Sequence, residues 1–120
     1  MSFRNLRAYE IGFELAMSIY KESKAFPKEE KYSLTDQIRR SSRSVCANIA
    51  EAYRKRIYPK HFIAKLSDAD SENSETQVWI EFAGACNYID RMKCRDLKRR
   101  SEEIGKLLQY MMINPRKFGS

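Results

Sequence analysis

The stretch from Ser33 to Glu51 constrains the fold most strongly, because its pattern predicts a helix with two unlike faces. At about 100° per residue, the first face consists of Leu34, Ile38, Ser41, Val45, Asn48, Ile49 and Ala52. The opposite face carries Arg39, Arg43 and Arg54, with Ala50 among them. The first face has to be buried against other helices. Because it includes Ser41 and Asn48, its packing must satisfy hydrogen bonds as well as fill volume.

Length and composition indicate one helical domain. The chain has 120 residues, of which 42% are hydrophobic and 32% charged, with only four Gly and three Pro. These values favour an ordered helical protein with a single core, and we expect one domain over residues 1–120. No apolar run approaches the roughly 20 residues that span a bilayer, and the N-terminus lacks the apolar core of a signal peptide. We therefore expect a cytoplasmic protein that does not bind membranes.

The residues that usually carry chemistry are sparse. Cys46, Cys86 and Cys94 are odd in number and lack CxxC spacing, which favours buried reduced thiols over disulfides or a zinc site. A single histidine, His61, excludes the two Glu-x-x-His pairs of a di-iron bundle. No set of nucleophile, base and oxyanion donor can be assembled around it. We expect neither enzymatic activity nor a cofactor or metal.

Caps and breakers predict four helices, at about residues 5–25, 33–58, 59–86 and 90–113. Asn5 and Asp90 are candidate N-caps, and Asn87 is a candidate left-handed C-cap. Pro59 suits the first turn of the third helix, so the turn before it is tight and the second and third helices must be antiparallel. Residues of these two helices whose numbers sum to about 117 should then face each other. The predicted fold is an all-α, up-down-up-down antiparallel four-helix bundle.

The first predicted helix has two apolar stripes that lie nearly opposite each other. We expect the larger one to face the core of the bundle, and it consists of Leu6, Tyr9, Phe13, Ala16, Met17 and Tyr20. The other stripe contains Ile11, Leu15 and Ile19, which form a continuous ridge. This ridge predicts an oligomer interface, because a helix needs only one stripe for its own bundle. Alternatively, a wide bundle interior covers both stripes.

The antiparallel register also predicts a polar layer between the second and third helices. Glu72 and Glu75 come level with Arg43 and with Arg40 or Arg39. Asn48 comes level with Asn73. Such pairs specify register more reliably than they add stability, since desolvation offsets much of the Coulomb gain. The predicted members of the layer are Asn48, Glu51, Glu72, Asn73 and Glu75.

Charge is unevenly distributed along the chain. The total is +7, and residues 1–32, 33–66, 67–90 and 91–120 carry +1, +6, −6 and +6. The acidic segment can pair with its basic neighbours, or the uncompensated bases can attract a polyanion. One candidate basic strip consists of Arg39, Arg40, Arg43, Arg54, Lys55, Arg56 and Lys60. A second consists of Arg95, Lys98, Arg99 and Arg100.

Three blocks of the sequence resemble a known family. QIRRSSRSVCANIAEAYRKR (37–56) is similar to the signature of bacterial four-helix-bundle proteins first noticed as products of intervening sequences in 23S rRNA genes. ADSENSETQVWI (69–80) and YMMINPRKF (110–118) resemble the third-helix and C-terminal patterns of that family. The resemblance implies a four-helix bundle and, from related structures, a ring of five subunits. The accessory protein of diversity-generating retroelements is a more distant relative, a basic pentameric barrel that binds nucleic acid and a reverse transcriptase.

The resemblance assigns no chemical role to any residue. Family positions that match here are Gln37, Arg40, Ser44, Asn48, Ile49, Glu51, Glu75 and Trp79. Ala52 stands where many members have Gly, which should favour helix without changing the fold.

Two functional hypotheses follow from the sequence. The first is a non-catalytic, homo-oligomeric module, by the resemblance a homopentamer, that binds nucleic acid, preferably RNA, through its basic strips. Tyr53 and Tyr58 lie among these bases and either stack on nucleobases or pack at the helix end. The alternative is a scaffold or adaptor whose basic surface recognises an acidic protein partner and which does not bind nucleic acid. RNA is the favoured ligand, and the sequence itself does not distinguish RNA from DNA.

Overall fold

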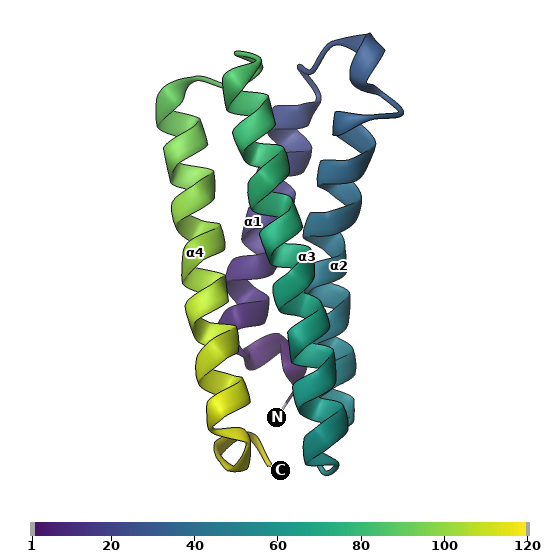
Figure 1. Cartoon of the computed structure of the whole chain (residues 1–120), viewed down its shortest axis with the longest axis vertical. Helices are drawn as coiled ribbons and strands as arrows, with labels where there is room; N and C mark the ends of the chain where they lie inside the picture. The colour runs from purple at the N-terminus through teal and green to yellow at the C-terminus, as the bar shows by residue number, and fades with distance from the viewer. Residues whose placement is uncertain (1, 120) are drawn as a thin grey trace.

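The structure is a computed structural model that describes residues 2–119. Four long helices run up and down along a bundle that is 44 Å long (Figure 1). They are α1 (Arg7–Ser23), α2 (Leu34–Arg54), α3 (Pro59–Ala85) and α4 (Arg91–Ile113). Three short 3₁₀ helices join or flank them, namely η1 (Phe3–Asn5), η2 (Lys28–Glu30) and η3 (Pro115–Phe118). The predicted all-α four-helix bundle is confirmed, and the described residues contain no strand.

The largest differences from the predicted helix bounds lie where local turns replace helix. Asn5 does not cap α1, because Asn5 Oδ1 instead accepts a 3.2 Å hydrogen bond from the backbone N–H of Ser2 and closes η1. Helix α2 ends at Arg54 instead of residue 58, and Tyr58 N donates to Lys55 O at 2.9 Å in the turn that follows. At the other end of the bundle, Asn87 has φ 62° and Asp90 accepts from Lys93 N at 2.8 Å. Both of these predicted caps are confirmed.

The core is aliphatic and draws on all four helices. The predicted inner face of α2 is buried, with Ile38, Val45 and Ile49 at most 2% exposed. Partner helices supply the remaining large core side chains, among them Ile19, Phe62, Leu66, Ile80, Ile104 and Leu108. None of the described helices is long and apolar enough to cross a bilayer.

The prediction for α1 is wrong, because its two stripes are exchanged. Ile11, Leu15 and Ile19 are only 4%, 2% and 1% exposed and lie in the core of the chain's own bundle. They cannot form an oligomer interface. Phe13 and Met17 are on the outside instead, 51% and 41% exposed.

Close packing of α1 against α2 explains which stripe is buried. Gly12 lies on the same side of α1 as Ile11 and Leu15. A Cβ atom at Gly12 would lie only 3.3 Å from Cys46 Sγ, so the missing side chain allows α1 to approach α2 closely. The opposite side carries Phe13 and aromatic hydroxyl groups, which are too bulky or too polar for this contact.

The cysteines differ in exposure. Cys46 is buried, and burial raises the pKa of its thiol to about 11. Cys94 is half-buried, whereas Cys86 is exposed because it caps the C-terminus of α3 at the end of the bundle. All three thiols are free, and the prediction of burial is wrong for Cys86.

Two polar contacts cross the otherwise aliphatic core. Asn73 Nδ2 donates to the Ser101 carbonyl at 2.8 Å, and Ser101 Oγ donates to Asn73 Oδ1 at 2.9 Å, which joins α3 to α4. A 2.8 Å hydrogen bond from Thr76 Oγ1 to Ser41 Oγ joins α3 to α2. The residue numbers of Ser41 and Thr76 sum to about 117, as the predicted antiparallel register of α2 and α3 requires. Helix α3 is thus held in register on both sides by hydrogen bonds shielded from water.

We expect Ser101→Ala to lower the free energy of unfolding by about 1–3 kcal/mol, because it leaves a buried amide oxygen of Asn73 without a donor. Urea denaturation followed by circular dichroism measures the change. Ser67→Ala on the exposed face of α3 is the control, and it should change stability by less than about 0.5 kcal/mol. Equal effects of the two variants would show that the Asn73–Ser101 contact is not a structural clamp.

Candidate nucleic-acid interface

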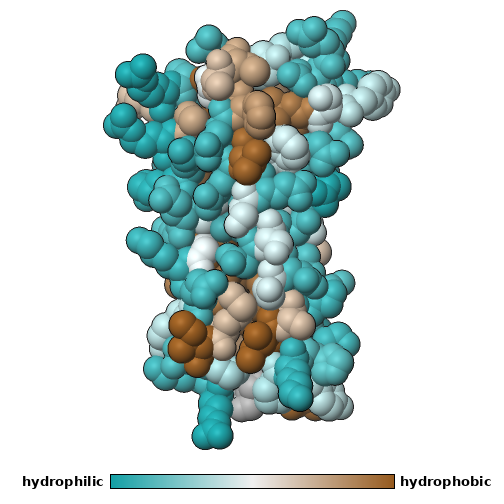
Figure 2. Space-filling model, viewed as in Figure 1, coloured by the Kyte–Doolittle hydropathy of each residue, from teal (hydrophilic) through white to brown (hydrophobic). Residues whose placement is uncertain are grey.

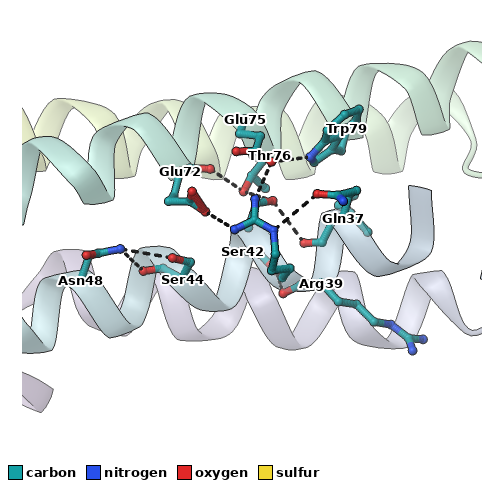
Figure 3. A network of polar contacts seen from close by, with 12 residues as sticks. Gln37, Arg39, Ser42, Ser44, Asn48, Glu72, Glu75, Thr76 and Trp79 are labelled. Atoms are coloured by element: carbon teal, nitrogen blue, oxygen red, sulfur yellow. Dashed lines mark hydrogen bonds and ion pairs between the residues drawn. The ribbon is translucent and has the colours of Figure 1, made fainter. Parts of the chain in front are cut away.

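The best-connected cation of the predicted strips is Arg40, which bridges two carboxylates of α3 (Figure 3). Its Nη1 donates to Glu72 at 3.0 Å and its Nη2 donates to Glu75. The Glu75 carboxylate also accepts a 3.3 Å hydrogen bond from the indole N–H of Trp79. The hydrogen bond to Glu75 raises the pKa of the Arg40 guanidinium, and the two carboxylates neutralise its charge. Arg40 therefore fixes the α2–α3 pair and is not available to a polyanion.

The predicted polar layer forms only in part. Glu72 and Glu75 take part through Arg40, and Asn73 takes part through Ser101. Asn48 does not reach Asn73, since its side-chain amide donates within α2 to the carbonyl and hydroxyl of Ser44 (Figure 3). Glu51 is exposed and pairs with Lys65 at 2.9 Å. Glu51 thus joins α2 to α3 in the predicted register, although on the surface. Asn48 was misplaced because helical spacing gives the facing of a residue but not the partner of its side chain.

Arg39 and Arg43 lie against α1. Arg39 points away from the Arg40 network (Figure 3), and its Nε donates to Ser23 Oγ at 2.7 Å. The guanidinium groups of Arg39 and Arg43 lie 4.9 and 5.8 Å from the centre of the Tyr20 ring. Such contacts order the arginines over an aromatic face. Arg43 stays exposed beside the half-exposed ring of Phe13.

The second strip is split by an acid. Arg99 and Arg100 both bind Asp96 at 2.9 Å, and Arg100 also donates to Ser18 Oγ of α1 at 3.0 Å. The hydrogen bond from Arg99 lowers the pKa of Asp96, and Arg100 lowers it further. Arg95 and Lys98, together with Arg99, line an open cleft of about 660 Å³ at the α3–α4 turn. Of the second strip, only Arg95 and Lys98 lack an ion pair within residues 2–119.

A group of cations without neighbouring aspartate or glutamate in its segments lies at one end of the bundle. The α2–α3 turn and both ends of the chain meet there (Figure 1). The segments concerned are residues 2–9, 52–67 and 104–119, and none of them contains an aspartate or glutamate. We call this region the basic end and define it by seven cations, namely Arg4, Arg54, Lys55, Arg56, Lys60, Arg116 and Lys117.

Aromatic packing holds two of the three segments of the basic end together, those of the α2–α3 turn and of the C-terminus. Phe118 of η3 lies 6.4 Å from Phe62 of α3 and 6.2 Å from Tyr110 of α4, measured between ring centres. The guanidinium of Arg56 lies 4.0 Å from the centre of the Tyr53 ring, which is buried. Arg54, Lys55 and Lys60 are exposed, and they form no ion pair within the described part of the chain. The arrangement presents cations on a rigid base.

The structure therefore divides the first predicted strip. Arg39, Arg40 and Arg43 contact neighbouring helices, whereas the four cations from Arg54 to Lys60 belong to the basic end. Sequence reasoning missed Arg4, Arg116 and Lys117 as members of the same surface. The sequence feature that could have identified them is the absence of acidic residues from both terminal segments. The bundle topology is also needed, because it brings those segments to the end of the bundle that holds the α2–α3 turn.

No candidate metal centre lies among the described residues around these cations. Residues 2–119 hold no group of three histidine, cysteine or acidic side chains that is arranged to bind a metal ion. His61 is exposed at the start of α3, with its ring 5.9 Å from that of Tyr58.

Comparison with known proteins gives two similarities. The sequence pattern of the 23S rRNA-intervening sequence proteins matches residues 4–110. A crystal structure from Bacteroides thetaiotaomicron, described as a protein with unknown function from the S23 ribosomal protein family, is 33% identical in sequence, with a TM-score of 0.79. The similarity covers 88% of this chain and 94% of the other. No curated protein is similar to this chain.

The Arg40 network predicts unequal roles for two glutamates of α3. We expect Glu75→Ala to lower the free energy of unfolding by about 1 kcal/mol, since it removes an ion pair and the acceptor of the Trp79 indole. Glu81→Ala should change it by less than about 0.5 kcal/mol, because Glu81 is exposed and forms no ion pair within the described residues. Urea denaturation of both variants is the measurement. Equal small changes would show that both residues are ordinary surface acids.

Proposed function

We propose that this chain, which belongs to the family of 23S rRNA-intervening sequence proteins, is a non-catalytic, homo-oligomeric module that binds nucleic acid, preferably RNA, through its basic end. The main support for the proposal is that three segments without aspartate or glutamate lie together at one end of the bundle. Seven cations lie there, and the acidic residues of α3 that balance Arg40 are farther along the bundle.

The charge arrangement supports phosphate binding. Clustered lysines and arginines that are not neutralised by carboxylates attract a polyanion and release its condensed counterions on binding. Binding of this kind is largely independent of sequence and weakens steeply with salt. Arg54, Lys55 and Lys60 are exposed and have no acidic neighbour between residues 52 and 67, so phosphate contact requires no ion pair of theirs to break.

The exposed side of α1 supports self-association. Phe13 and Met17 leave a contiguous apolar surface between Tyr9 and the exposed Arg43. On the outer side of α3, Val78 and Phe82 are 46% and 55% exposed and flank the acidic Glu81. These two surfaces are complementary in charge and both apolar. We propose that they join neighbouring copies head to tail, which closes a ring and repeats the basic end by symmetry.

A specific feature also favours the alternative of a protein adaptor. A cleft of about 400 Å³ is lined by Tyr32, Trp79 and Phe82, together with polar groups of the η2–α2 connection. Exposed aromatic residues around a cleft are typical anchors for a protein partner. An adaptor would depend on these aromatic residues and not on the basic end.

We expect the double substitution Arg54→Glu and Lys55→Glu to reduce affinity for a labelled RNA strand by at least about tenfold at low salt. Fluorescence anisotropy across a salt series provides the measurement, and in the wild-type protein the logarithm of affinity should fall linearly with the logarithm of salt concentration. The control is Lys28→Glu with Lys31→Glu, which changes net charge equally at the opposite end of the bundle and should change binding far less.

The control separates a local site from general charge attraction. If both double variants lose affinity equally, net charge alone explains the binding and the basic end is not a site. If wild-type protein binds no nucleic acid at low salt, the proposal fails and protein partners become the better hypothesis.

Self-association has its own test. We expect Phe13→Ser with Met17→Ser to convert an oligomer into a monomer, as measured by light scattering coupled to size exclusion. These side chains are half-exposed, so the bundle itself should remain folded. Met92→Ser with Ile113→Ser removes two more exposed apolar side chains from α4 and should leave the mass unchanged. A wild-type protein with the mass of one chain would contradict the proposal.

A further inference from the structure

We infer that the exposed ring of Tyr58 stacks on an unpaired nucleobase, so that the basic end prefers single-stranded nucleic acid to duplex. This inference rests on the proposed function, because the cations of the basic end supply the phosphate contacts that bring a strand to the ring. It adds a contact that phosphate attraction alone does not provide.

The backbone around Tyr58 is held firmly. Tyr58 N donates to Lys55 O and Phe62 N donates to Tyr58 O, both at 2.9 Å. The backbone N–H and the backbone carbonyl of Tyr58 are therefore both hydrogen-bonded. Pro59 follows directly and restricts the conformation of Tyr58 to the extended region, where φ is −112° and ψ is 92°. A ring on such a backbone loses little conformational freedom when it binds a ligand.

The ring itself is largely free. Tyr58 is 57% exposed, and its one aromatic neighbour within residues 2–119 is His61, which meets it at an interplanar angle of 74°. Tyr53 lies five residues earlier but is only 8% exposed and is covered by the guanidinium of Arg56. Of the two tyrosines that the sequence placed among the bases, the structure leaves only Tyr58 accessible for stacking.

The surroundings of Tyr58 combine positive charge with apolar surface. Arg54, Lys55 and Lys60 lie within four residues of it, and Ile57 beside it is 66% exposed. Figure 2 shows hydrophobic residues gathered near both ends of the visible face, with hydrophilic groups projecting from the lower end. Exposed aromatic and aliphatic side chains among unpaired cations match the arrangement that binds single strands, in which cations follow the backbone and rings stack on bases.

The same geometry disfavours a duplex at this ring. In a duplex the faces of the bases are covered by their neighbours, so only an unpaired or splayed base offers a π-face to a side chain. Tyr58 should therefore increase affinity for single strands while contributing little to duplex binding.

The experiment compares three probes in the full-length protein by fluorescence anisotropy at one low salt concentration. They are a labelled oligouridine, an abasic strand with the same number of phosphates, and an RNA duplex of the same length. We expect wild-type protein to bind oligouridine roughly tenfold more tightly than the abasic strand. Tyr58→Ala should remove this difference, whereas Tyr58→Phe, which keeps the ring, should retain it.

Tyr32→Ala is the matched control, because Tyr32 is 85% exposed at the other end of the bundle, and it should retain the difference. Thermal unfolding by circular dichroism verifies that each variant is folded. Equal wild-type affinity for oligouridine and the abasic strand would overturn the stacking inference while leaving phosphate binding intact. A folded Tyr58→Phe variant that behaves like Tyr58→Ala would also overturn it. If wild-type protein binds none of the three probes, the proposed function itself fails.

Discussion

The contact between α2 and α3 is the constraint on which the rest of the bundle depends. Arg40 joins these helices on the surface through Glu72 and Glu75. The Ser41–Thr76 hydrogen bond joins them in the buried core. Both contacts allow only one register, because a shift along the helix would leave buried hydroxyls and a carboxylate unpaired. With this pair fixed, α1 and α4 have defined grooves to fill.

The same contact determines which charges remain available. It uses two acids of α3 to neutralise Arg40, while Asp96 pairs with two arginines of α4 and offsets part of their charge. Residues 52–67 around the α2–α3 turn contain no acidic residue, and the nearest one, Glu51, pairs with Lys65. The uneven charge seen along the sequence thus becomes an uneven charge in space, concentrated at the basic end.

Much of the fold followed from local patterns, whereas the site did not. The apolar face of α2, the left-handed Asn87 and the antiparallel register depend on spacing and caps, which a sequence displays directly. The buried side of α1 was mispredicted because both of its apolar stripes have helical spacing, so the sequence pattern does not distinguish them. The close approach of α1 to α2 at Gly12 determines which stripe is buried. The basic end was only partly predicted, since the topology of the whole bundle brings the terminal segments that carry Arg4 and Arg116 to the end with the α2–α3 turn.

Under the proposed function, the position of the acid-free segments determines how the molecule would meet a charged strand. The bundle is 44 Å long and these segments lie at one end, so the field of a polyanion favours an approach with that end first. The footprint is then the cross-section of the bundle, 25 by 21 Å. Each subunit would occupy a short stretch and leave the sides of its helices free for neighbouring copies.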